Sequence, residues 1–253
     1  MKLLAIDGSG TSAGISVLTE SAVLADYFVN YKKTHSQTLL PMIDETMKMV
    51  ETEPAELDYV AVCSGPGSFT GLRICASTAK GLALALNVPI VAVKSLEAMA
   101  YNFEGTVNTL ICPMMDARRG QVYTGIYMFK EDAEGKGLTV IKDQCAVSAE
   151  EIIAEVNACA KSKDCSVIFL GDGVSVNLGR ISETMTVRFV VAPPQLLLQR
   201  GSSLGRCALS MIEKGEVVSA TEFVPDYYRI SQAEREKMER GEEVPERETN
   251  DNF

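Results

Sequence analysis

Short runs of apolar residues, separated by turns of small or polar residues, predict that the chain begins with three strands. The runs cover residues 2–7, 14–18 and 22–31, and the third alternates in part between apolar and polar positions. The apolar spacing then changes to that of a helix over residues 37–50, where Thr38 is placed to cap the first turn. We therefore expect an antiparallel start followed by a helix.

The pattern then alternates between buried strands and helices. A strand is expected at residues 59–63, a helix at 70–86 after a Gly-Pro-Gly turn, and a further strand at 89–93. The first half of the chain is thus predicted to have the element order βββαβαβα.

The second half repeats this order. Ser148, with Glu151 three residues later, forms a capping-box pattern for a helix that extends to Ala160. The strands expected around this helix cover residues 110–114, 121–129, 138–147 and 167–170.

Two sequence offsets support a duplication. Asp7 and Asp116, which each follow the first strand of a half, lie 109 residues apart, and Val60 and Val167 lie 107 residues apart. Two βββαβαβα halves, each with a turn after its first strand, match the layout of the actin-like ATPase (ASKHA) superfamily. The sequence therefore predicts an α/β protein of two duplicated domains with mixed sheets.

These elements suggest a division of the chain into domains. We expect residues 1–103, completed by 215–230, to form the first domain and residues 104–214 to form the second. Residues 231–253 carry eight acidic and four basic side chains, with a glycine and a proline that interrupt any long helix. This segment is predicted to be an acidic, partly disordered tail.

Composition limits the function. The 24 basic and 34 acidic side chains give a net charge of −10, which opposes binding of tRNA by this chain alone. No apolar run reaches the roughly 18–20 residues of a membrane helix, so we expect a cytoplasmic protein without membrane contact. Seven cysteines without CxxC pairs are typical of buried, reduced thiols.

Three turns, at residues 7–9, 116–118 and 171–173, contain residues suited to contact with an anion. Glycine allows close approach of backbone amides to a phosphate, and carboxylates beside such a turn can hold magnesium. An ordinary hairpin turn explains any one of these segments equally well. As a group they are interpreted as a vestigial nucleotide or anion cleft, whose candidate residues are Asp7, Gly8, Ser9, Asp116, Arg118, Gly171, Asp172 and Gly173.

The segment CSGPGSFTGLRIC, residues 63–75, is more specific, because strand, turn and helix start fall within thirteen residues. The chain also contains LAIDGSGTSAGISVL near its start, HSQTLLPMI at 35–43, MDARRGQVY at 115–123 and VPDYYR at 224–229. With these segments, which span nearly the whole chain, the sequence resembles the TsaB (YeaZ) family.

The resemblance implies a paralogue of TsaD, an ATP-dependent transferase that binds a metal through two histidines of an HMEGH segment. Here the matching stretch is KSLEAM, so Ser95 and Met99 stand at the histidine positions and only Glu97 is kept. His35 is the sole histidine of the chain. We therefore expect no metal site, no cofactor of its own and no peptidase activity, with ATP and metal bound by the TsaD partner. A serine nucleophile at Ser68 with His35 as base is disfavoured, since GPGSFTG is not the GxSxG motif.

Both predicted helices of the first half are apolar on more than one side, which indicates that each covers a sheet and a second surface. Full burial within a larger domain is the alternative. The resemblance implies that these helices form a bundle with TsaD. The residues expected at this interface are Leu39, Ile43, Met47, Leu72, Ala76, Ala79 and Ala83.

The favoured function is that of a non-catalytic partner that binds and activates a TsaD-like transferase for threonylcarbamoyl addition to adenosine 37 of tRNAs reading codons that start with A. A heterodimer with that transferase, a TsaE-like ATPase as further partner, and contact with tRNA only through the complex are expected. One alternative is an ATP-dependent kinase or hydrolase that uses Asp7 and Asp116 around magnesium. The other is a homodimeric scaffold. The residues leave open whether a nucleotide binds this chain and what Glu97, His35 and the acidic tail do.

Overall fold

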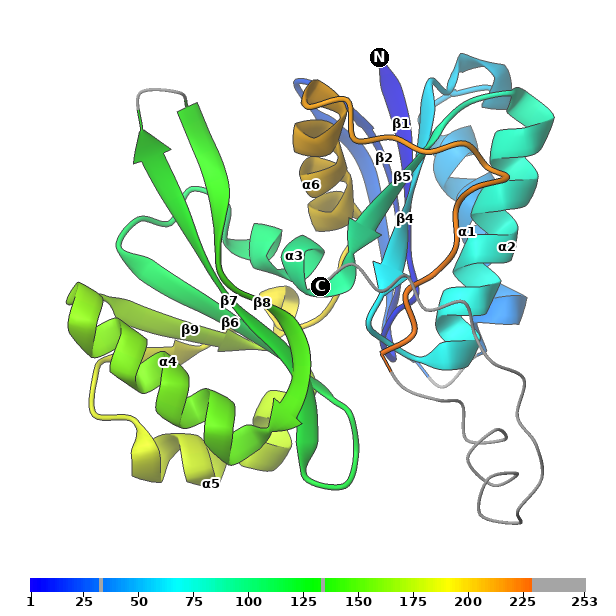
Figure 1. The fold of residues 1–253 in the computed structure, drawn as a ribbon. Coiled ribbons are helices and arrows are strands. Elements are labelled where there is room, and N and C mark those ends of the chain that lie inside the picture. Colours follow the sequence, from blue (N-terminus) through cyan, green and yellow to red (C-terminus); the bar gives the residue numbers. More distant parts are fainter. Residues whose placement is uncertain (32–33, 133–134, 229–253) are drawn as a thin grey trace, which may run out of the picture.

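A computed structural model describes residues 1–31, 34–132 and 135–228, apart from the side chains of residues 131–136. It contains two five-stranded sheets that lie side by side, each with helices against it (Figure 1). The two sheets have the same strand order when the halves of the chain are aligned, so the predicted duplication and the α/β actin-like fold are confirmed.

The first sheet has the order β3-β2-β1-β4-β5. Its first three strands pair antiparallel, whereas β1, β4 and β5 run parallel, as buried strands joined by helices do. The strands are β1 (Lys2–Asp7), β2 (Ala13–Thr19), β3 (Val23–Val29), β4 (Tyr59–Gly65) and β5 (Ile90–Lys94).

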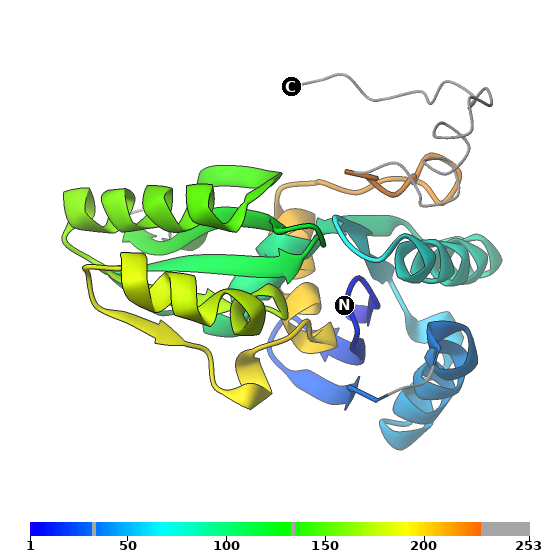
Figure 2. The same ribbon diagram turned by 90° about the horizontal axis from the view of Figure 1, so that it is seen from below.

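Helices cover both faces of this sheet. Helices α1 (His35–Met49) and α2 (Phe69–Leu86) lie on one face, and α6 (Gly201–Glu213) lies on the other (Figures 1 and 2). Short 3-10 turns occur at Pro54–Glu56, Tyr101–Phe103 and Pro194–Leu196.

The second sheet has the order β10-β9-β6-β7-β8, which is the plan of the first. On its outer face, helices α4 (Ala149–Lys163) and α5 (Gly173–Thr184) enclose a separate apolar core. The strands are β6 (Thr109–Asp116), β7 (Gln121–Asp132), β8 (Gly135–Ser148), β9 (Ser166–Leu170) and β10 (Phe189–Val191).

The inner face of the second sheet joins the core of the first domain. Short helix α3 (Ser95–Ala100) packs against β6 and β7, and its Leu96 and Met99 are buried with Ile111 and Tyr127 of these strands. Because one apolar cluster runs from the first domain into this face, the domains are held together by hydrophobic contact.

The domain boundary differs from the prediction. Helix α6 lies within the predicted second domain of residues 104–214, but it packs against the first sheet. The chain therefore returns to the first domain near residue 200. The segment of residues 215–228 contacts the first domain, where Val218 pairs with Ile90 of β5. The predicted tail, residues 231–253, lies outside the described residues.

The helix caps confirm one prediction and correct another. The Ser148 hydroxyl accepts a hydrogen bond from the Glu151 amide at 3.1 Å, as expected for the N-cap of α4, although the helix ends at Lys163 rather than Ala160 and only this half of the predicted capping box is formed among the described contacts. Helix α1, however, begins at His35 after Thr34, so the prediction that Thr38 caps it was wrong. The Thr38 hydroxyl instead donates to the Thr34 carbonyl oxygen at 3.3 Å, as residues inside a helix do.

Candidate functional site

The turn after β1 contains a buried carboxylate. Asp7 is fully buried, and its Oδ1 accepts hydrogen bonds from the Ser9 amide at 2.9 Å and the Ser9 hydroxyl at 2.7 Å. Its Oδ2 has no hydrogen-bond partner among the described residues. Burial raises the pKa of Asp7, although the bonds from Ser9 oppose this shift. The carboxylate is thus directed into the protein.

The turn is in backbone contact with the start of α2. The Ser68 amide donates to the Ser9 carbonyl oxygen at 2.7 Å. A Cβ atom at Gly67 would overlap the same oxygen, and one at Gly71 would overlap the carbonyl oxygen of Gly8. Gly67 and Gly71 of GPGSFTG are therefore required for this close approach.

His35 lies on a second side of the turn. Its Nε2 is 3.0 Å from the Gly10 carbonyl oxygen, to which it donates. Its ring carbon Cδ2 lies 3.2 Å from the position of a Cβ at Gly8 and equally close to that at Gly71. The half-buried ring thus fills the space that these glycines leave.

Gln199, from the segment that returns to the first domain, lies on a third side. A Cβ at Gly10 would be 2.6 Å from its side-chain amide, and the Ser12 hydroxyl lies 3.4 Å from its Oε1. Only 1% of Gln199 is exposed. Side chains and backbone therefore occupy the space around the turn where an open phosphate site would need room.

The second domain has a similar but more exposed turn after β6. The Asp116 amide donates to the Asp172 carboxylate at 3.0 Å, and the Arg118 amide donates to the Asp116 carboxylate at 2.7 Å. Gly171, at φ +103°, packs against the Met114 carbonyl oxygen, where a side chain would overlap it. Burial raises the pKa of Asp172. Each domain thus packs its second glycine turn against its first.

The structure brings the predicted cleft residues together as two separate groups. Asp7, Gly8 and Ser9 form the first, and the second contains Asp116, Arg118 and the turn of residues 171–173. Among the described residues, no hydrogen bond or ion pair joins the two groups. A shared nucleotide site between them stays a prediction.

The start of α3 contains the segment for which the resemblance implied a lost pair of metal-binding histidines. Ser95 and Met99 are both fully buried. Glu97 lies 3.6 Å from the Lys94 ammonium, and this ammonium also lies 3.0 Å from Asp143 of β8. Burial raises the pKa of Glu97. Within residues 1–31, 34–132 and 135–228, no cluster of three or more His, Cys, Asp or Glu side chains could hold a metal ion.

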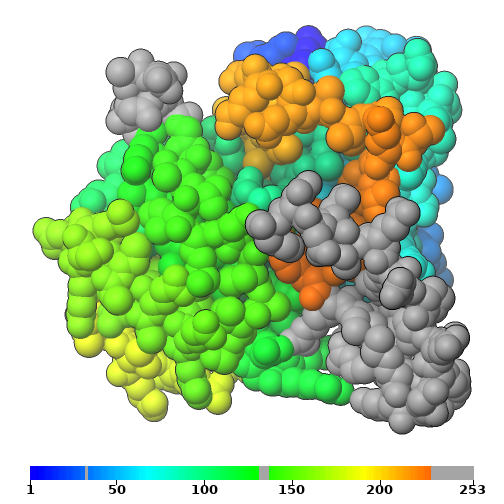
Figure 3. All heavy atoms as spheres, in the orientation of Figure 1, coloured from blue at the N-terminus to red at the C-terminus, as the bar shows by residue number. Residues whose placement is uncertain are grey.

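Residues 216–228, here named the strap, run along the first domain and reach the second (Figures 1 and 3). Val218 exchanges two backbone hydrogen bonds of 2.9 Å with Ile90, and the Asp226 amide donates to the Ser64 carbonyl oxygen at 2.7 Å. At its end, the Tyr228 hydroxyl accepts from the Gln144 side chain of β8 at 3.0 Å. The strap therefore links both domains.

The predicted interface residues are core residues. All seven face the interior of the chain's own first domain, so the prediction that they form the docking surface is corrected. An apolar residue under a helix and one on its outer side give the same sequence pattern, which is why the pattern misplaced them. Their exposed fractions lie between 0 and 6% for Leu39, Ile43, Met47, Leu72, Ala76, Ala79 and Ala83.

Other apolar residues of these helices are exposed, and the solvent-facing surface of α1 and α2 is here named the α1/α2 face. Leu40 and Met49 of α1 are 59% and 85% exposed, and Leu84 of α2 is 58% exposed. A Cβ at Gly81 would have no neighbour within 4 Å. This face could receive another helix at short distance, because a glycine lets two helices approach closely.

Sequence reasoning missed the residues that join the domains. Gln199, Asp143 and Gln144 belong to no recognisable motif, and their contacts lie 49 to 187 residues away in the chain. Only Tyr228 lies within one of the distinctive segments, VPDYYR, which offered a signal for the strap.

The fold is that of an actin-like ATPase-type protein, and its first glycine turn is enclosed by its own side chains. Residues 22–237 match the family described as TsaD, tRNA N6-adenosine threonylcarbamoyltransferase. The tRNA threonylcarbamoyladenosine biosynthesis protein TsaB of Bacillus subtilis is 36% identical, over 94% of this chain and 99% of its own length.

TsaB of Escherichia coli is 28% identical, over 90% of this chain and 95% of that protein. The solved structure of YeaZ from Pseudomonas aeruginosa superposes with a TM-score of 0.73 at 26% identity, covering 89% of this chain and 99% of that one. The chain belongs to the TsaB (YeaZ) family. In the part of the chain that is described, no helix is both long and apolar enough to cross a membrane.

Proposed function

We propose that this chain is a non-catalytic subunit that binds and activates a TsaD-like transferase. The reaction served is threonylcarbamoyl addition to adenosine 37 of tRNAs reading codons that start with A. Two kinds of similarity support this role: relatives named for tRNA threonylcarbamoyladenosine biosynthesis cover nearly the whole chain, and a family described as the transferase matches residues 22–237.

The enclosed turn is the observation that carries the proposal. In an actin-like ATPase, a carboxylate of the first turn must reach a hydrated magnesium ion. Here Asp7 is fully buried and bonded to Ser9, while Gln199 and His35 fill the surrounding space. This arrangement favours catalysis by a partner, which supplies the ATP and metal sites, over nucleotide chemistry on this chain.

The α1/α2 face is the surface we assign to the transferase. Exposed apolar side chains on this surface, such as Leu84, would lose water contact when a partner covers them, and removal of apolar area from water stabilises complexes. Methionine side chains adapt to different surfaces, so the same face could also pair two copies of this chain in isolation.

The net charge of the chain indicates how it would meet tRNA. With a net charge of −10, the chain would meet tRNA only within the complex, where the transferase supplies basic contacts. A TsaE-like ATPase is the additional protein expected in the assembly.

The test uses two glycines, Gly81 of α2 and Gly179 of α5, at which an added Cβ would meet no atom within 4 Å. Gly81→Arg places a charge on the α1/α2 face, whereas Gly179→Arg places the same charge on the second domain. Both substitutions replace glycine in a helix, so both should leave folding intact. Each variant is mixed with the TsaD-like protein, and complex formation and modified tRNA nucleoside are measured.

We expect Gly81→Arg to lose complex and modification together, and Gly179→Arg to retain both. The proposal is wrong if Gly81→Arg no longer pairs yet supports full modification. It is also wrong if the purified chain alone hydrolyses ATP in a magnesium-dependent reaction that Asp7→Asn abolishes, because this would locate catalysis here.

A further inference from the structure

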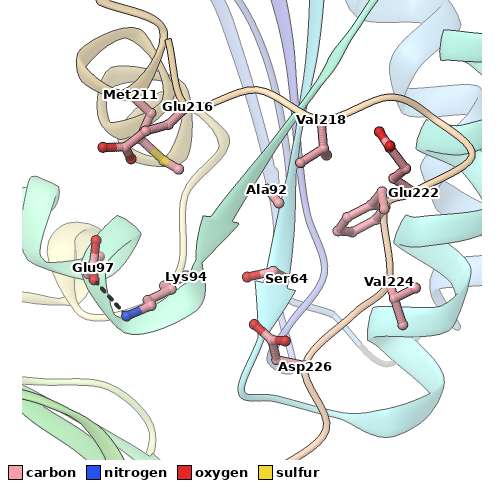
Figure 4. A pocket seen from close by; sticks show the side chains of 11 residues that line it. Ser64, Ala92, Lys94, Glu97, Met211, Glu216, Val218, Glu222, Val224 and Asp226 are labelled. Atoms are coloured by element: carbon pink, nitrogen blue, oxygen red, sulfur yellow. Dashed lines mark ion pairs between the residues drawn. The ribbon is translucent and has the colours of Figure 1, made fainter. Parts of the chain in front are cut away.

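A cavity of about 420 Å³ lies between the strap, β5 and helices α3 and α6, and none of its lining residues belongs to α1 or α2. Figure 4 shows Lys94 and Glu97 on one side, Val218 and Val224 of the strap on the other, and Ser64 and Asp226 between them. Its size is within the range of small-molecule sites, which is roughly 300–1,000 Å³.

Ser64 supplies an unused polar group in this cavity. Its residue is only 3% exposed, yet its hydroxyl makes no hydrogen bond within the described part of the chain. The hydroxyl points into the open space beside Asp226 (Figure 4). Its oxygen is open to the cavity, so a hydrogen-bonding group that enters the cavity can pair with it.

The charge of the cavity is negative. Lys94, its one basic lining residue, already contacts Glu97 and Asp143. Glu216 and Asp226 have no ion-pair partner among the residues described, and burial raises the pKa of Asp226. An anion would therefore meet uncompensated carboxylates, whereas a cation would offset them.

The remaining lining determines which kind of cation fits. Ala92, Met211, Val218, Phe223 and Val224 give the cavity an apolar part, which a bare or hydrated metal ion would not use. The described residues also offer no group of three ligands close enough for a metal. A ligand with both alkyl carbon and an ammonium group would match the lining, because the alkyl carbon can pack against the apolar part and the ammonium group can pair with the carboxylates.

We propose that this cavity binds a small aliphatic diamine or polyamine, with one ammonium group between Asp226 and the Ser64 hydroxyl and the alkyl chain along Val218 and Phe223. No residue that lines the cavity lies on α1 or α2, so occupancy of the site and formation of the complex are measured in separate experiments.

The experiment is calorimetric titration of the full chain with 1,4-diaminobutane and with spermidine at physiological salt, which screens exposed charges. Asp226→Asn removes the carboxylate of the site, and Asp44→Asn removes an equal charge from the exposed face of α1. Ala92→Phe fills the cavity without changing charge, and circular dichroism checks that each variant is folded.

We expect one saturable site per chain, about tenfold weaker in Asp226→Asn, lost in Ala92→Phe and unchanged in Asp44→Asn. Absence of saturable binding to the wild-type chain at millimolar amine would overturn the proposal. Equal weakening by Asp226→Asn and Asp44→Asn would also overturn it, since binding would then follow net charge alone.

Discussion

The His35 imidazole donates to the Gly10 carbonyl oxygen across 3.0 Å, which ties the first residue of α1 to the turn after β1. The sole histidine of the chain is thereby placed as a structural link between a helix and the glycine turn, with its ring packed beside Gly8 and Gly71. The same turn would be the phosphate site in an active member of the fold, so its packing is central to the function proposed.

Replacing His35 with alanine should lower the free energy of unfolding by about 1–3 kcal/mol, because a hydrogen bond and the contacts of the ring are lost. Urea denaturation measures the effect. Ser36→Ala, at the next and exposed position, is the matched control and should change stability little. Equal stability of the His35→Ala variant and the wild type would show that the ring does not hold the turn.

Asp7→Asn should stabilise the protein at neutral pH. Burial raises the folded-state pKa of Asp7 above the unfolded value of about 3.9, so its contribution to stability is fully present below that value and is lost as the pH rises through the folded pKa. Asparagine keeps the acceptor for Ser9 without a buried charge.

Urea denaturation of the wild type and Asp7→Asn at several pH values checks this. The advantage of the variant should be largest near pH 7 and should shrink on acidification. A variant that is less stable at neutral pH would mean that the charge itself holds the turn together.

Two glycines of α2 should respond oppositely to alanine. Gly71→Ala places a Cβ against the Gly8 backbone, which must move, and such overpacking costs about 1–3 kcal/mol. Gly81→Ala meets no neighbouring atom and should stabilise the helix by about 1 kcal/mol. Thermal denaturation of both variants measures the difference. Similar melting temperatures would contradict the close contact between α2 and the turn.

Ala79→Arg should unfold the first domain rather than merely dissociate a complex. Ala79 is fully buried on the inner side of α2, and an unpaired buried charge costs roughly 3–5 kcal/mol. Circular dichroism and denaturation of the lone variant test this, with Gly81→Arg on the same helix as the folded control. If the Ala79→Arg chain is stable but fails to bind the transferase, Ala79 would have to be an interface residue after all.

Local patterns predicted most of the elements because the periodicity of a strand or helix depends only on residues that are close together in the sequence. The predicted strand at residues 2–7 is β1 without change, and the predicted helix at 70–86 differs from α2 by one residue at its start. The duplication was visible because Asp7 and Asp116 each follow an equivalent strand.

Properties that depend on distant contacts were not predictable in this way. The apolar pattern of α2 does not say which side faces the sheet, so Ala79 was placed on the surface although it is fully buried. The position of α6 on the first sheet depends on packing against β1 and β2, nearly 200 residues earlier in the chain. The contact between Gln199 and Gly10 was also not predictable, since no residue near Gln199 in the sequence indicates it.

The return of α6 to the first sheet bears on how the chain is made. The five strands of that sheet are complete at Lys94, but the helix that covers one of its faces ends only at Glu213. During translation, Leu18, which lies against Gly205 of α6 in the finished protein, stays uncovered on that face while more than a hundred further residues are added. Ribosomes that stall within the second half would therefore hold a nascent chain with an open apolar sheet, a natural substrate for chaperones.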